Sequence, residues 1–308
     1  MPPLQQSLPK LTRRSVLASL GGYLIADLAL PTALRADRNP DWTDPLAPYR
    51  IAGNLYYVGS RDLASFLITT PQGHILINSN LTTSPPQIRT SVEKLGFHWK
   101  DIKIHLISHG HFDHCAGSAQ IKRETGARYM VMDGDVSAVE SGGRSDFQYG
   151  NDKDSLYPPA KVDRILHDRD EVRLGGAILT AHKTAGHTKG CTTWTMQLHE
   201  DSKVFNAVII GSPNVNPGYK LIHNTAYPQI ATDYQATFRT LKSLPCDIFL
   251  GAHGLYYDML EKVKRQQSGD KNAFIDPAGY KAYVADRQQA FETELAKQQN
   301  SRATAHST

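Results

Sequence analysis

Short apolar runs bounded by turn-forming residues recur along the chain from Asp37 onward, and amphipathic stretches separate them. Runs of about four to eight apolar or alternating residues are typical of strands, whereas apolar residues three and four apart predict helices. The two kinds alternate without a low-complexity linker. Predicted strands cover residues 54–58, 65–70, 74–78, 103–108, 128–132, 171–174, 177–183, 192–198, 204–210 and 247–252.

The amphipathic stretches predict five helices. They cover about 86–95, 115–125 and 229–244, and two more follow near the C-terminus. One face of the last helix, from 277 to about 299, carries Tyr280, Tyr283, Val284, Phe291 and Leu295, so we expect this face to pack on the core. Two mixed halves, each with a sheet and outer helices, predict an α/β sandwich with the sheets inside and functional loops along one rim.

Three histidines and an aspartate follow the predicted strand 103–108 within six residues: His109, His111, Asp113 and His114. Imidazole and carboxylate are ligands that Zn²⁺ accepts at about 2.0 to 2.2 Å. Residues two apart in an extended loop point the same way, so His109 and His111 would converge on one metal ion. Asp113 and His114, at the turn into a helix, would face a neighbouring ion. The cluster predicts a metal site with two ions.

Two further histidines follow predicted strands in glycine-flanked loops. His187 lies in the segment Ala185-Gly186-His187-Thr188, and His253 lies in Gly251-Ala252-His253-Gly254. Either histidine alone would be unremarkable. Together with the cluster at 109–114 they are the imidazoles needed to complete two coordination shells.

The HxHxDH pattern at 109–114, the GHT at 186–188 and the GAH at 251–253 resemble the metallo-beta-lactamase superfamily, and most closely subclass B3 of the class B beta-lactamases. The resemblance covers residues 41–296. It implies a four-layered αβ/βα fold and two Zn²⁺ ions. The implied ligands are His109, His111 and His187 for the first zinc and Asp113, His114 and His253 for the second.

Ser212, after the predicted strand 204–210, is the discriminating position within this resemblance. Members that cleave thioesters, lactones or phosphodiesters usually have an aspartate there that bridges both metals, and other beta-lactamase subclasses have a cysteine ligand. A neutral hydroxyl replaces neither anion, so the second zinc must rely on His114, as in subclass B3. The iron-containing redox branch usually has a glutamate in place of His111.

The implied activity is zinc-dependent hydrolysis of the beta-lactam amide bond in penicillins, cephalosporins and carbapenems, which confers antibiotic resistance. Two zinc ions about 3.5 to 4 Å apart would supply hydroxide at neutral pH without a covalent enzyme intermediate. Asp113 would orient this nucleophile, Ser212 and Asn214 would bind the substrate carboxylate, and Tyr219 would support the carbonyl oxygen as a catalytic and substrate-binding residue. A same-fold hydrolase of lactones, thioesters or phosphodiesters is the alternative, and a non-catalytic zinc-binding protein is the third possibility.

A serine-nucleophile mechanism has little support in the sequence. Ser91 and Ser268 each begin an SxxK pattern, but the SDN and KTG motifs of serine beta-lactamases are absent. Among the three cysteines, Cys115 and Cys191 are expected to be small buried residues. Cys246 matches one half of a disulfide found in some relatives, but no cysteine stands in the partner region near 276–277, so we expect no bond.

The charge distribution and the N-terminus bear on partners and location. Of the net charge of +4, the first 36 residues hold +3, which leaves 30 basic against 29 acidic groups and no nucleic-acid footprint. Arg13-Arg14 before a weakly apolar stretch resemble a twin-arginine export signal, and Asp27 and Pro31 within that stretch disfavour a membrane anchor. We expect residues 1–36 to be a cleaved signal and 37–308 a single periplasmic domain, monomeric and bound to a small beta-lactam substrate.

Overall fold

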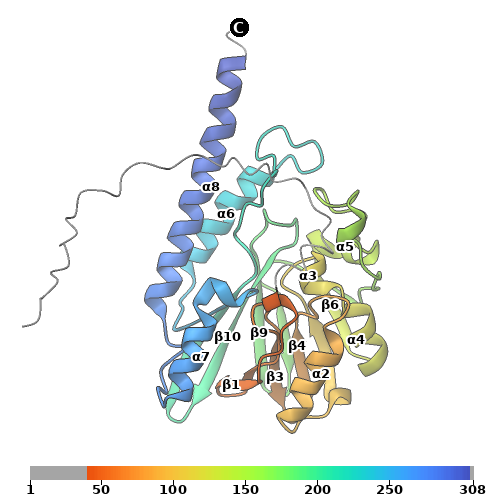
Figure 1. The fold of residues 1–308 in the computed structure, drawn as a ribbon, viewed down its shortest axis with the longest axis vertical. Helices are drawn as coiled ribbons and strands as arrows, with labels where there is room; N and C mark the ends of the chain where they lie inside the picture. Colours follow the sequence, from red (N-terminus) through yellow and green to blue (C-terminus); the bar gives the residue numbers. More distant parts are fainter. Residues whose placement is uncertain (1–39, 306–308) are drawn as a thin grey trace, which may run out of the picture.

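Two β-sheets face each other in the computed structural model, which describes residues 40–305 (Figure 1). The seven-stranded sheet has the order β1-β2-β3-β4-β5-β6-β7, antiparallel from β1 to β4 and parallel from β4 to β7. Its strands are β1 (Tyr49–Ala52), β2 (Leu55–Tyr57), β3 (Phe66–Thr70), β4 (Gly73–Ile77), β5 (Ile102–Leu106), β6 (Arg128–Met132) and β7 (Arg164–Leu166).

The five-stranded sheet has the order β12-β11-β10-β9-β8, and only the β11–β12 pair is parallel. Its strands are β8 (Glu171–Leu174), β9 (Ala177–Lys183), β10 (Thr192–Glu200), β11 (Lys203–Ile210) and β12 (Ile248–Gly251). The predicted α/β sandwich of two mixed sheets with outer helices is therefore confirmed.

Both faces of the seven-stranded sheet are buried, and the period of two assigns each side chain to a layer. Phe66, Ile75 and Ile77 belong to the large core between the sheets. Leu67 and Leu76 point the other way and pack with the residues of α2 (Pro85–Lys94) and α4 (Ser118–Thr125). The consecutive apolar residues at 75–77 in β4 follow from this double burial.

The outer helices cover the two sides of the sandwich, with α2 and α4 on one side and α6 (Ile230–Ser243) and α8 (Pro277–Ala305) on the other (Figure 1). The predicted apolar face of α8 is confirmed, because Tyr280, Val284 and Phe291 are buried in the main core. The ring of Phe291 lies 5.2 Å from that of Tyr234 on α6. Further helices are α7 (Met259–Gln267), α5 (Val136–Glu140) and the 3₁₀ turns Pro40–Trp42, Trp99–Asp101, Asp133–Asp135, Lys153–Ser155 and Gly254–Tyr257.

The predicted helix 115–125 is wrong in one respect, because the structure has two helices there, α3 (Phe112–Cys115) and α4. Gly117 lies at the break, where its N–H donates to the carbonyl of Asn80 over 3.2 Å. A Cβ at this position would lie 2.8 Å from the carbonyl oxygen of Ser79. Close packing on the segment after β4 therefore interrupts the helix and leaves α3 as a single turn.

The loops that carry the candidate ligands are tied together across the two sheets. The N–H of Thr192, at the start of β10, donates to the carbonyl of Ser108 over 2.7 Å. The indole of Trp194 donates to the carbonyl of Ile107 over 3.1 Å. These bonds hold the end of β5 against the five-stranded sheet and place both sets of loops on one rim.

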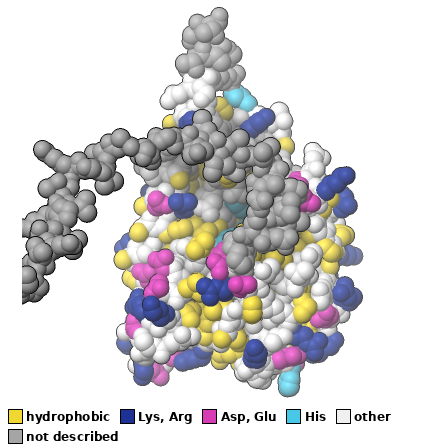
Figure 2. Space-filling model, viewed as in Figure 1, with side chains coloured by type: hydrophobic (Ala, Val, Ile, Leu, Met, Phe, Trp, Pro, Cys, Tyr) yellow, Lys and Arg dark blue, Asp and Glu magenta, His cyan; other side chains and the backbone are white. Residues whose placement is uncertain are grey.

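The predicted export signal, residues 1–36, lies outside the described residues. Within residues 40–305, the helices are too short or too polar to cross a membrane. Charged side chains of both signs are interspersed over the face seen in Figure 2.

Candidate metal centre

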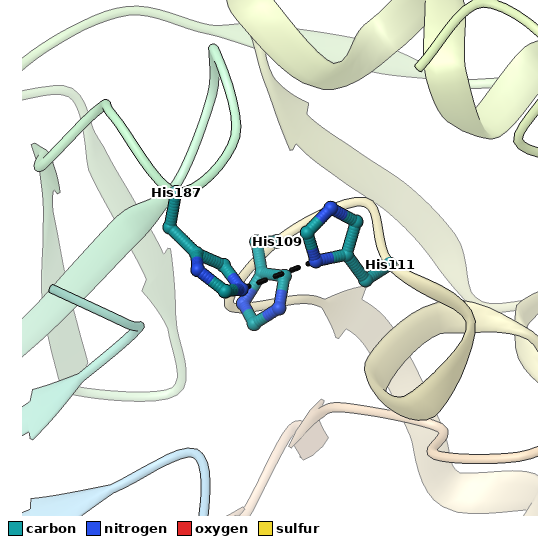
Figure 3. Close-up of side chains that lie close together, drawn as sticks. All are labelled: His109, His111 and His187. Carbon is teal, nitrogen blue, oxygen red and sulfur yellow. Dashed lines mark hydrogen bonds between the residues drawn. The ribbon is translucent and has the colours of Figure 1, made fainter. Parts of the chain in front are cut away.

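Three imidazoles from two loops converge at the first candidate site (Figure 3). His109 and His111 follow β5, and His187 lies in the loop between β9 and β10. Their ring nitrogens lie within 4.8 Å of one another, and Nδ1 of His111 is 3.1 Å from Nε2 of His187. All three side chains are buried. The structure thus brings together the first set of residues predicted from the sequence.

Asp113, His114 and His253 form the second candidate site beside the first. Nε2 of His114 lies 3.1 Å from Nε2 of His253 and 3.3 Å from a carboxylate oxygen of Asp113. Nε2 of His253 is 3.5 Å from the same oxygen. His109 also has a nitrogen within 4.8 Å of the ligand atoms of Asp113 and His114, so it lies between the two sets.

Burial favours the neutral form of three of the five histidines. Burial, with the nearby charge of His111, lowers the pKa of His187 to about 3. Burial also lowers the pKa values of His109 and His114. The pKa of His253 is raised to about 9, because hydrogen bonds with Asp113 and Asp62 outweigh burial. A metal ion must displace that proton, so metal affinity should fall in acid.

Unpartnered buried nitrogens test whether a metal fits here. Both ring nitrogens of His109 and Nδ1 of His114 are buried without a hydrogen-bond partner. Buried polar atoms normally have a partner. Two pairs of imidazole nitrogens also face each other at 3.1 Å beside the carboxylate of Asp113. This donor set of imidazoles and one carboxylate fits zinc.

Partners behind the histidines fix their orientation, and none of these contacts was predicted from the sequence. Nδ1 of His253 lies 2.9 Å from a carboxylate oxygen of Asp62, and Nδ1 of His187 lies 2.9 Å from the carbonyl of Asn214. Nε2 of His111 lies 3.5 Å from the buried carboxylate of Asp146. Such outer partners set the tautomer and ring orientation of metal-binding histidines. No local sequence signal marks Asp62 or Asp146.

A cavity of about 590 Å³ opens at the two sites, large enough for a drug-sized molecule. His111, Asp113, His187 and His253 reach its wall, and its other lining includes Trp42, Phe112, Tyr149, Tyr157, Tyr256, Asn214 and Asn216. A larger depression of about 1040 Å³ runs along β9 and β10, but none of the six ligand candidates lines it. Volume alone does not identify the site.

The three predicted substrate contacts occupy different positions. Asn214 lines the cavity, with its amide nitrogen 2.9 Å from the hydroxyl of Tyr256. Ser212 is buried, and its hydroxyl lies 3.3 Å from the same Tyr256 hydroxyl. Tyr219 is buried behind His187 and donates its hydroxyl to the carbonyl of His187 over 2.8 Å. Neither Ser212 nor Tyr219 is among the residues that line the cavity.

The cysteines are free thiols, and Cys115 and Cys191 are buried as predicted. The thiol of Cys115 donates to the carbonyl of His111, and that of Cys191 packs against the backbone of Ser212. Ser91, the first residue of one SxxK pattern, is buried in α2, and neither it nor Ser268 lines the cavity.

Comparisons with known proteins agree with this geometry. The family model of the metallo-beta-lactamase superfamily matches residues 61–200. The native FEZ-1 metallo-beta-lactamase from Legionella gormanii is 55% identical with a TM-score of 0.82, over 83% of this chain and 98% of that chain. The class B3 di-zinc metallo-beta-lactamase LRA-12 from an Alaskan soil metagenome is 36% identical with a TM-score of 0.79, over 83% and 96%.

A curated protein gives a partial match. The UPF0173 metal-dependent hydrolase of Rubrobacter xylanophilus is 32% identical over 80 residues, which are 26% of this chain and 31% of that protein. The match therefore spans about a third of that relative's length. The similarity to solved structures over most of the chain shows that it belongs to the metallo-beta-lactamase superfamily, within which it is similar to the subclass B3 enzymes.

Proposed function

We propose that this protein hydrolyses the amide bond of beta-lactam antibiotics with two zinc ions. One observation carries the proposal: two sets of candidate ligands meet at one cavity, and the second set has two imidazoles and one carboxylate with Ser212 where related hydrolases have a bridging aspartate. The similarity to FEZ-1 and LRA-12, both metallo-beta-lactamases, supports the same substrate class.

His109, His111 and His187 would hold the first zinc, and Asp113, His114 and His253 the second. When bound, the two ions supply hydroxide at neutral pH and a positive field for the charge that develops on the opened amide. Asp113, which lies within reach of both His114 and His253, orients the nucleophile. No side chain needs to form a covalent intermediate.

The wall formed by Asn214 and Tyr256 is our proposed contact for the substrate carboxylate. Asn214 lines the cavity, and its amide nitrogen, a hydrogen-bond donor, lies beside the Tyr256 hydroxyl at the cavity wall. Ser212 supports this wall through Tyr256. Direct contact between substrate and Tyr219 requires its hydrogen bond to the His187 carbonyl to open.

We also propose that residues 1–36 direct export to a bacterial periplasm and that residues 37–308 form the single mature domain. Beta-lactams act outside the cytoplasmic membrane, so hydrolysis in the periplasm would confer resistance. Replacement of Arg13 and Arg14 by lysine should retain the protein in the cytoplasmic fraction if the twin-arginine route is used. Unchanged periplasmic delivery of this variant would contradict that route.

The activity is tested with purified mature protein, a chromogenic cephalosporin, a lactone and a phosphodiester, each with and without chelator. We expect cephalosporin turnover that the chelator abolishes and zinc restores, with two zinc ions per chain by metal analysis. Chelator-sensitive cleavage of the lactone or diester without cephalosporin turnover would assign the chain to the alternative hydrolase class. If the zinc-loaded protein cleaves none of the three substrates, the result would support the third possibility, a non-catalytic zinc-binding protein.

Variants separate the roles of the residues. His187→Ala should remove turnover, whereas His98→Ala, an exposed histidine outside the site, should leave it unchanged. Ser212→Ala should mainly raise KM. Tyr219→Phe should lower kcat if the hydroxyl contacts substrate, but should lower zinc retention if it only holds the His187 loop. If the single substitution Ser91→Ala abolished turnover, the metal mechanism would be refuted.

A further inference from the structure

Asp135 is a buried carboxylate that the proposed reaction does not use. It lies at the end of the 3₁₀ turn after β6 and is 2% exposed. One oxygen accepts hydrogen bonds from the N–H of Gly110 over 2.8 Å and from the hydroxyl of Thr188 over 2.7 Å. The other accepts from the N–H of Gly190 over 2.8 Å. All three donors belong to ligand-bearing loops.

Each donor stands next to or close to a candidate ligand. Gly110 separates His109 from His111, and Thr188 directly follows His187. The two loops are far apart in sequence and come from different sheets. At the first candidate site, however, Nδ1 of His111 and Nε2 of His187 lie 3.1 Å apart. A site of this kind tolerates errors of only about 0.5 Å in ligand position.

The backbone around Asp135 is packed too closely for other side chains to replace these contacts. A Cβ on Gly190 would lie 2.4 Å from the amide nitrogen of Asp135, and a Cβ on Gly134 would lie 2.1 Å from the carbonyl oxygen of Lys189. The glycines let the two loops and the 3₁₀ turn meet through their backbones. The carboxylate is then the acceptor for the donors that converge there.

We infer that Asp135 is a positioning residue that sets the distance between the His109–His111 loop and the His187 loop, and thereby the affinity of the first metal site. This inference rests on the proposed function, because it takes those three histidines as ligands. The second site should depend on Asp135 much less, since the hydrogen bonds of the Asp135 carboxylate go to Gly110, Thr188 and Gly190 and not to Asp113, His114 or His253.

Asp135→Asn is the informative variant because it preserves the volume of the side chain. An amide NH₂ cannot accept a hydrogen bond, so at least one of the three donors loses its acceptor. We expect the zinc of the first site to be held about 10-fold more weakly, as for other partners of metal-bound groups. Asp133→Asn, two residues earlier on the same turn, is the matched control, since its carboxylate pairs with Lys183 at the surface.

The measurement is zinc release to a competing chelator, followed for both metals of the purified protein, together with the absorption of the Co²⁺-substituted protein. We expect one metal to be lost more readily in Asp135→Asn, the other to be retained as in the wild type, and Asp133→Asn to match the wild type. A purely structural role would lower the unfolding temperature without this selectivity. Equal retention of both metals, or equal weakening of both, would overturn the inference.

Thr188→Val keeps the test decisive if Asp135→Asn does not fold, because it removes only one of the three hydrogen bonds. A smaller weakening confined to the first metal supports the inference, and unchanged retention refutes it. The result is independent of turnover. A wild-type protein that binds two zinc ions but does not cleave a cephalosporin would refute the proposed function and leave the role of Asp135 measurable, whereas a wild type without zinc at the first site would overturn the inference itself.

Discussion

Acid should destabilise this protein through His105, a histidine that takes no part in the metal centre. His105 lies on β5 and is fully buried, with its ring stacked on Tyr129 at 5.1 Å. Its Nε2 lies 2.9 Å from the hydroxyl of Ser118 and its Nδ1 lies 3.3 Å from the carbonyl of Leu76. A neutral ring protonated on Nδ1 satisfies both partners. Burial disfavours the charged ring and lowers the pKa of His105 to about 4.

The magnitude follows from the difference between the folded and unfolded pKa values. An unfolded histidine titrates near pKa 6.5, so between about pH 6.5 and pH 4 the unfolded chain binds a proton that the folded chain does not. Stability must therefore fall as the pH decreases through this window. At about pH 5 the loss from this one group is about 2 kcal/mol, and it approaches about 3 kcal/mol below pH 4.

The test compares the wild type with His105→Gln, which keeps a polar side chain but does not titrate. Urea unfolding is measured at about pH 7.5 and pH 5 with excess chelator, so that acid release of metal does not contribute. The histidines of the metal centre titrate equally in both proteins and cancel in the comparison. We expect the variant to be less stable at the higher pH and the gap to narrow by about 2 kcal/mol at the lower pH.

A gap that stays constant between the two pH values would refute this reasoning, since it would mean that His105 titrates alike in both states. A gap that widens in acid would show that the imidazolium is stabilised in the folded protein. Either result would contradict the dominance of burial at this position.

The remaining predictions concern the metal centre, a helix and a turn. Asp62→Asn removes the carboxylate behind His253 and should weaken zinc binding at the second site about 10-fold, with the first site unchanged in chelator competition. Phe291→Ala should lower the free energy of unfolding in urea by about 3–5 kcal/mol, and Phe291→Leu by less than about 1.5 kcal/mol; equal effects would contradict the packing of α8. Gly134→Ala should cost about 1–3 kcal/mol, because its Cβ would lie 2.1 Å from the carbonyl of Lys189, and an unchanged unfolding midpoint would contradict this close approach.

The candidate ligands that the structure brings together could be grouped from the sequence because most of their signal is local. The strand before His109 is mostly apolar, with Ile104, Leu106 and Ile107, and the candidate ligands follow at its end. His187 and His253 also follow strands, so the rule that loops at one rim meet was enough to group them. The central strands were predictable for the same reason, since burial on both faces leaves an uninterrupted apolar segment.

The supporting residues could not be found in this way because their partners are distant in the chain. Asp62 lies 191 residues from His253, and Asp135 lies 53 residues from Thr188. An isolated aspartate in the sequence carries no sign of a buried position. Tertiary contact also decided the break between α3 and α4, which local helix propensity does not predict. The short strands β1 and β7 were not predicted, although β2 and β8, which are equally short, were.

The candidate ligands come from both sheets, and this division ties metal binding to the completion of folding. His109 to His114 follow the seven-stranded sheet, whereas His187 and His253 belong to loops of the five-stranded sheet. A chain that ends before β12 would hold five of the six candidate ligands, yet it would lack the imidazole that closes the second set. During synthesis, the last ligand therefore leaves the ribosome after most of the polypeptide, and full metal loading would report that both halves have docked.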